Sequence, residues 1–281
     1  MSSITIIMII TSIVSVIALY IDKHLLNIGI TRKDYFYYMC LSMIPFSLVT
    51  LVIEYLRGDI RFDFSIIPFI ILIFAMLFRY YKQFAYAGTV KSLTPYENMA
   101  YTSLGIVLAF IIDIILKNRD FNYFSFLAII LTIIGVFLLS NNRLRSNGLK
   151  KDLVIRIVGN VILGFIANIM LRYWSNAMYI LLLNLFLTMF FSKDYTIKYH
   201  IKNKKIIKWV FIQQTFGFTY VYLFNYLSSI SITTSNFVAP IVIMLLFLIA
   251  LISKKNDKRI KFKDFISMIL ICIGMFLINL V

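Results

Sequence analysis

Four polar side chains follow the apolar segment 66–78, and their spacing places them on one face of a helix. Lys82, Gln83 and Tyr86 lie three, four and seven positions after Arg79. The segment 66–78 alone would span about 20 Å, short of the roughly 30 Å hydrocarbon core of a membrane, so the helix must continue through these residues. A charge at membrane depth is costly unless it faces a cavity or a partner. We therefore expect this face to line a solute pathway; the alternative is two cations that snorkel to the headgroups.

A carboxylate stands at the start of the next apolar segment. Pro95 suits the first turn of a helix, and the helix dipole favours Glu97 in that turn. This is the simple structural interpretation of Glu97. The alternative pairs Glu97 with Lys82 or Arg79, where it could bind a cationic group or exchange a proton during transport.

Amide and aromatic side chains recur in the segments after residue 209. Gln213 and Tyr220 share a helical face and could cradle a small organic solute. For any one of these amides, a hydrogen bond between helices is the alternative role. Pro240 is predicted to kink its segment. The predicted substrate pathway consists of Arg79, Lys82, Gln83, Tyr86, Glu97, Asn98, Tyr101, Gln213, Gln214, Tyr220, Asn225 and Asn236.

The composition predicts that these residues belong to a membrane protein. The chain is 61% apolar and 14% charged, with a mean hydropathy of +0.90, whereas soluble domains are about 45–50% apolar and about 25% charged. The net charge of +16 comes from Lys and Arg between the apolar segments, where membrane surfaces explain them. We expect a lipid bilayer and a small-molecule solute as partners, and no nucleic acid.

About 20 apolar residues span a bilayer. By this criterion we expect ten transmembrane helices, at 4–21, 35–53, from 66 onward, 96–116, 123–139, 153–170, 177–191, 209–229, 233–252 and 265–281. The polar segment 141–152 is the predicted linker between a first five-helix repeat, 1–140, and a second, 153–281.

An internal sequence repeat supports this division. A shift of 139 positions aligns 134–139 (IGVFLL) with 273–278 (IGMFLI), so that Gly135 meets Gly274 and Phe126 meets Phe265. The surrounding hydropathy pattern repeats as well, which indicates a duplicated half. Because five spans per half is an odd number, the two halves must be inverted, as in many secondary transporters.

These features resemble the drug/metabolite transporter superfamily, in particular its EamA-like members. The matching positions are 84–87 (FAYA), the segment around Pro240, and the motifs of Gly135 and Gly274. The resemblance covers essentially the whole chain and implies a ten-helix transporter, but Tyr101 stands where the family has a proline. Loops after odd-numbered spans carry 20 of the 28 Lys and Arg, which predicts both termini outside the cytoplasm. The resemblance implies both termini inside, and the sequence leaves the two orientations open.

The sequence contains no Walker A motif, no metal-ligand spacing and no nucleophile elbow. We therefore expect no enzymatic activity, no cofactor and no metal. The predicted function is that of a secondary transporter that moves a small organic metabolite, anionic or zwitterionic, by alternating access. The alternatives are a lipid-linked sugar flippase on the same fold and a non-transporting membrane scaffold. We expect a multi-pass protein of the bacterial cell membrane. A homodimer is compatible with the sequence.

Overall fold

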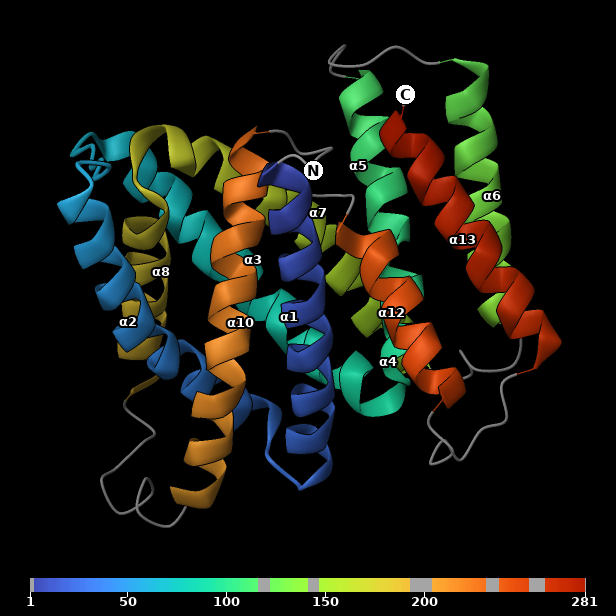
Figure 1. The fold of residues 1–281 in the computed structure, drawn as a ribbon. Helices are drawn as coiled ribbons and strands as arrows, with labels where there is room; N and C mark the ends of the chain where they lie inside the picture. The colour runs from blue at the N-terminus through green and yellow to red at the C-terminus, as the bar shows by residue number, and fades with distance from the viewer. Residues whose placement is uncertain are drawn as a thin grey trace.

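The computed structural model describes residues 3–115, 122–140, 147–192, 204–230, 238–252 and 261–280, and the regular elements in these ranges are α-helices (Figure 1). Ser103 alone separates α4 (Pro95–Thr102) from α5 (Leu104–Ile115), and both lie in the fourth predicted segment. With these two taken together, the described helices correspond to the ten predicted segments. The helices are α1 (Ser3–Asn27), α2 (Arg32–Leu56), α3 (Ile66–Ser92), α4 (Pro95–Thr102), α5 (Leu104–Ile115), α6 (Tyr123–Ser140), α7 (Asn147–Tyr173), α8 (Asn176–Phe191), α10 (Lys204–Ile230), α12 (Val238–Ile252) and α13 (Phe262–Leu280).

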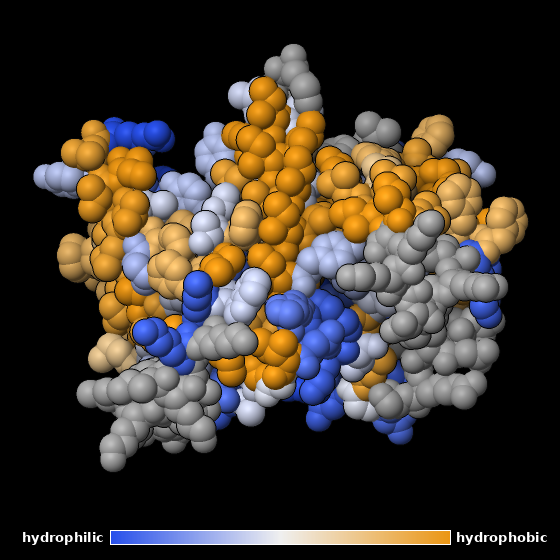
Figure 2. Space-filling view, turned by 60° about the horizontal axis from the view of Figure 1, so that its bottom comes forward, coloured by the Kyte–Doolittle hydropathy of each residue, from blue (hydrophilic) through white to orange (hydrophobic). Residues whose placement is uncertain are grey.

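Among the described helices, α1, α2, α3 and α7 are long and apolar enough to cross a membrane. Their outward faces are apolar: on α1 the side chains of Ile6, Ile10, Ile13 and Ile17 recur at helical spacing and are all exposed. Exposed apolar surface of this extent is typical of contact with a membrane or another protein. Figure 2 shows this apolar side giving way to hydrophilic residues toward the lower end of the bundle.

The third predicted span continues past its apolar part as expected. Helix α3 runs unbroken for 27 residues. Its first half exposes apolar side chains, whereas most residues from Gln83 to Val90 are buried, and α7 packs against the helix. Gly88 permits this approach, because a Cβ there would collide with the Arg32–Asp152 ion pair, whose N–O distance is 3.1 Å.

The fourth predicted span, 96–116, is not one continuous helix in the structure. The backbone N–H of Ser103 donates to both Met99 and Ala100, and its hydroxyl donates to the Ala100 carbonyl at 2.6 Å. These short-range bonds tighten the chain and end α4 before α5 begins. The interruption occurs without a proline.

The helices of residues 1–140 pack mainly against helices from the rest of the chain. Helix α1 contacts α10 and α12, α7 contacts α3 and α5, α2 contacts α8, and α6 contacts α13. In Figure 1, α1 begins and α13 ends at the same end of the bundle. Helix α7 begins at Asn147, so the predicted linker 141–152 contributes its last residues to that helix, and 141–146 lie outside the described residues.

Candidate solute-binding cavity

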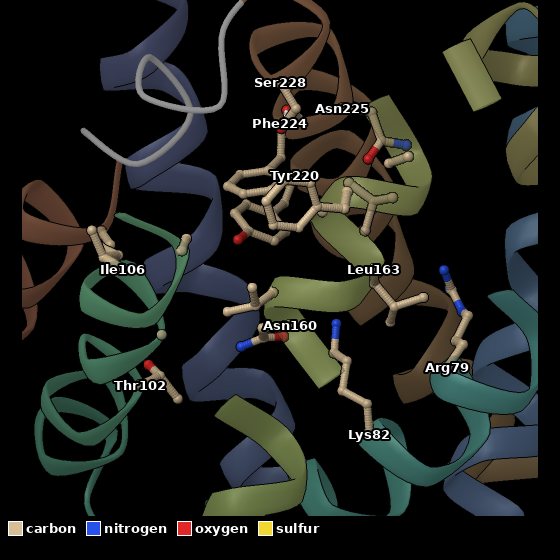
Figure 3. A pocket seen from close by; sticks show the side chains of 18 of the residues that line it. Arg79, Lys82, Thr102, Ile106, Asn160, Leu163, Tyr220, Phe224, Asn225 and Ser228 are labelled. Atoms are coloured by element: carbon tan, nitrogen blue, oxygen red, sulfur yellow. Dashed lines mark hydrogen bonds between the residues drawn. The ribbon is translucent and has the colours of Figure 1, made fainter. Parts of the chain in front are cut away.

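A cavity of about 210 Å³ lies between helices from both parts of the chain (Figure 3). Helices α3, α4 and α5 line it from one part, and α7, α8, α10 and α12 line it from the other. Ligand pockets for drug-sized molecules measure about 300–1,000 Å³, so a solute that fits here is small.

Two cations from α3 form one side of the cavity. The Arg79 guanidinium donates to Asn184 Oδ1 at 3.2 Å and contacts the Met43 sulfur, but its buried Nε has no hydrogen-bond partner. Lys82 makes no hydrogen bond or ion pair with the described part of the chain, and its amino group points toward Asn160 (Figure 3). No carboxylate is found among the described residues that line the cavity. The cations therefore face the cavity without an acidic counter-charge in its wall.

The opposite side of the cavity is aromatic and weakly polar. The rings of Tyr220 and Phe224 lie side by side, with 5.6 Å between their centroids. Beyond them, Asn225 and Ser228 occupy the far end (Figure 3). The cavity is therefore amphipathic, with positive charge at one side and aromatic surface at the other.

Hydrogen bonds at the start of α8 fix the position of Asn225. Its amide donates to Asn176 Oδ1 at 3.0 Å, and Asn176 in turn donates to the Tyr222 carbonyl. The buried carboxylate of Glu54, from α2, accepts from the Ala177 N–H at 3.1 Å and from the Tyr222 hydroxyl at 2.9 Å. An anion at a helix N-terminus satisfies free N–H groups and the helix dipole. Helices α2, α8 and α10 are thereby joined at this end of the bundle.

The structure brings four of the predicted pathway residues to the cavity, namely Arg79, Lys82, Tyr220 and Asn225. Gln83 lies outside this lining and donates to the Met39 sulfur.

Glu97 caps its own helix rather than meeting the two cations. Its Oε2 accepts from the Thr94 N–H at 2.9 Å, within a capping box at the start of α4. The structure contains no ion pair between Glu97 and Lys82 or Arg79 in the described residues. The simple structural interpretation of Glu97 thus accounts for its observed position.

The remaining predicted residues lie elsewhere. Gln213 and Gln214 hydrogen-bond to each other, and Tyr101 is buried in the core beside the cavity. Asn236 lies outside the described residues. Pro240 is the third described residue of α12, and the predicted kink stays a prediction.

Tyr86 and Asn98 belong to a second polar cluster that the sequence analysis did not find. The Tyr86 hydroxyl donates to Asp22, and Asn98 accepts from Arg156. Asp22 follows the first predicted span, 4–21, directly, but the helix continues beyond it through the buried Leu25 and Leu26. Arg156 stands alone in the apolar segment 153–170, which was a signal for an interior charge.

The lining residues of the cavity offer groups that can bind a solute. One guanidinium and one ammonium group can bind an anion by charge-assisted hydrogen bonds, and the aromatic wall can pack against an apolar body. The described residues contain no cluster of His, Cys, Asp or Glu that could hold a metal ion. Neither a family model nor a curated protein matches the chain.

Proposed function

We propose that this chain is a secondary transporter, built from two inverted five-helix repeats, that moves a small organic anion or zwitterion across a membrane by alternating access. The proposal combines three observations: a repeated pattern of helix packing, an exposed apolar surface, and a cavity between helices of both parts of the chain. Two cations and no acidic residue are among the described residues that line this cavity. The cations in the cavity are the observation from which we infer the class of solute.

The contact between α6 and α13 supports the inverted repeat. A Cβ on Gly135 would lie 2.9 Å from the Ser267 carbonyl, and one on Gly274 would lie 2.7 Å from the Ala128 carbonyl. The shift of 139 positions that aligns the two glycines also aligns Ala128 with Ser267. The two contacts are therefore the same contact with the partners exchanged, as two-fold symmetry requires.

Other helix pairs show the same relation, in which the two parts of the chain exchange roles. If each helix is matched with the one five spans later, the pair α3–α7 becomes α10–α1, and the pair α5–α7 becomes α12–α1. All four pairs are packed together in the structure. Repeats related in this way support alternating access, because the rocking of one repeat against the other exchanges inward-open and outward-open states.

The two cations, which have no acidic partner among the described residues, favour an anionic solute. A buried charge without a partner costs free energy, and a bound anion removes that cost. The anionic group would lie between Arg79 and Lys82, and an apolar or aromatic body would pack on Tyr220 and Phe224. With no nucleotide-binding motif in the sequence, an ion or solute gradient or an exchange reaction would drive the movement.

The test is a series of three probes that share a benzene ring and differ in charge: benzenesulfonate, neutral benzenesulfonamide and cationic benzyltrimethylammonium. Thermal unfolding of the detergent-purified protein is measured with each. We expect stabilisation by benzenesulfonate, approaching about 2.7 kcal/mol at a hundredfold excess over Kd, and little by the other two. Equal stabilisation by all three, or by none, would contradict an anion site.

Filling the cavity without touching its charges is expected to block the site. A Cβ on Gly164 meets no atom within 4 Å, although Gly164 lines the cavity. The variant Gly164→Leu should therefore lose benzenesulfonate binding. Its stability should hold or rise by about 1 kcal/mol, because leucine is a better helix former than glycine. Thermal unfolding with and without the probe measures both effects.

The matched control is Gly148→Leu, near the start of the same helix, where a Cβ also meets no atom. This variant should bind the probe as the wild type does. Retained binding in Gly164→Leu would show that the solute occupies another place.

A further inference from the structure

Asp22 is a buried carboxylate in the interior of the bundle that the proposed solute site does not use. It lies on α1 and is only 3% exposed. The Tyr35 hydroxyl, from α2, donates to its Oδ1 at 2.5 Å, and the Tyr86 hydroxyl, from α3, donates to its Oδ2. Both donors are neutral groups.

Arg156 is close to Asp22 but does not pair with it. Its guanidinium lies 4.7 Å from the centroid of the Tyr86 ring and donates to Thr89 Oγ1 at 2.9 Å and to Asn98. No ion pair joins Arg156 to Asp22 in the described structure. Tyr86 thus stands between the two charges, with its ring against the cation and its hydroxyl on the carboxylate.

The same cluster reaches the solute cavity. Tyr220, from α10, lines the cavity and interacts electrostatically with both Tyr86 and Arg156. Lys82, also in the cavity wall, is repelled by Arg156. Tyr86 and Arg156, which act on Asp22, therefore also act on groups in the cavity wall.

The titratable and charged groups that act on Asp22 are Tyr35, Tyr86 and Arg156, from α2, α3 and α7. Of the other helices that pack against α1, α10 brings Tyr220, which acts on Tyr86 and Arg156, and α12 contains no titratable residue. A membrane-buried carboxylate that receives only neutral hydrogen bonds can be neutralised by a proton, and such residues mark proton relays in transporters.

We propose that Asp22 carries one proton in each transport cycle, so that the anion and H⁺ move in the same direction. This inference rests on the proposed transport of an anion. A proton from water on one side binds a carboxylate oxygen of Asp22 to form the neutral acid, and the same O–H bond breaks on the other side. The co-transported proton cancels the charge of a monovalent anion, so the transport step moves no net charge against the membrane potential.

The experiment uses the full chain in liposomes that contain the pH indicator pyranine, with radiolabelled benzenesulfonate as the probe. This anion stays ionised throughout, so it carries no proton by itself. Counterflow, the exchange of external label for internal unlabelled probe, tests the proposed function. Accumulation of label under an imposed gradient, acidic outside, tests the inference. The wild type should accumulate the label and acidify the lumen as the probe enters.

The ratio of protons to probe should fall on the order of tenfold or more in Asp22→Asn, which keeps the acceptor shape but cannot bind the proton. The control Asp59→Asn, at an exposed acid after α2, should keep the wild-type ratio. Tyr86→Phe leaves the carboxylate and removes one donor, and should move the pH at which accumulation is half-maximal. It serves in place of Asp22→Asn if that variant does not fold.

The outcomes separate the two proposals. Absence of wild-type counterflow overturns the proposed function. Counterflow without gradient-driven accumulation or lumenal acidification in the wild type overturns the proton coupling alone. An unchanged proton-to-probe ratio in folded Asp22→Asn overturns the assignment to Asp22.

Discussion

Replacing Lys82 with methionine is expected to abolish most of the anion binding while making the empty protein more stable. Lys82 presents its amino group to the cavity without a partner in the described structure. A hydrogen bond to a charged group contributes about 1.5–3 kcal/mol, so its loss should weaken benzenesulfonate binding roughly thirtyfold. Methionine keeps a similar length and apolar stem, so the packing of that stem on Gly159 should survive.

The substitution that weakens binding should nevertheless stabilise the empty protein. In the empty state the ammonium group is partly buried and is repelled by Arg79 and Arg156. Its removal should raise the free energy of unfolding by about 1 kcal/mol. Thermal unfolding with and without benzenesulfonate measures both effects in one series.

The matched control is Lys91→Met, at an exposed position in the last turn of α3 and outside the cavity. It should leave binding and stability close to wild type. A Lys82→Met variant that binds benzenesulfonate normally would remove Lys82 from the site. One that is strongly destabilised would indicate that the ammonium has a structural partner.

Replacing Gly274 with valine is expected to lower the free energy of unfolding of the protein by a large amount. A Cβ there would lie 2.7 Å from the Ala128 carbonyl and 2.8 Å from the Thr132 nitrogen, both backbone atoms of α6 that cannot swing aside. Helices α6 and α13 would have to move apart, at a cost of about 3 kcal/mol. The midpoint of thermal unfolding measures this loss.

Gly135→Val should behave in the same way, because Gly135 makes the equivalent contact with the Ser267 carbonyl. The control is Gly148→Val, where a Cβ meets no atom. If the two glycine variants were as stable as this control, α6 and α13 would not pack as described, and the argument for the repeat from this contact would fall.

The hydropathy of the sequence was enough to predict the helices. Long apolar segments must satisfy their backbone groups internally, and helices do so within a single segment. The same reasoning predicted that α3 continues through Arg79 and Lys82, because the apolar part before them is too short to span a membrane. The break at Ser103 was not predicted, because it depends on local hydrogen bonds that any serine can make or omit.

The sequence by itself determined the all-α class, the succession of ten helical segments, and the cationic face of α3. These follow from local composition and helical periodicity, which the neighbours of a residue in the chain decide. Only the tertiary structure decided which polar side chains meet. Asp22, Tyr86 and Arg156 are brought together from three helices far apart in sequence. Such contacts depend on how helices pack, and no spacing within one segment encodes them.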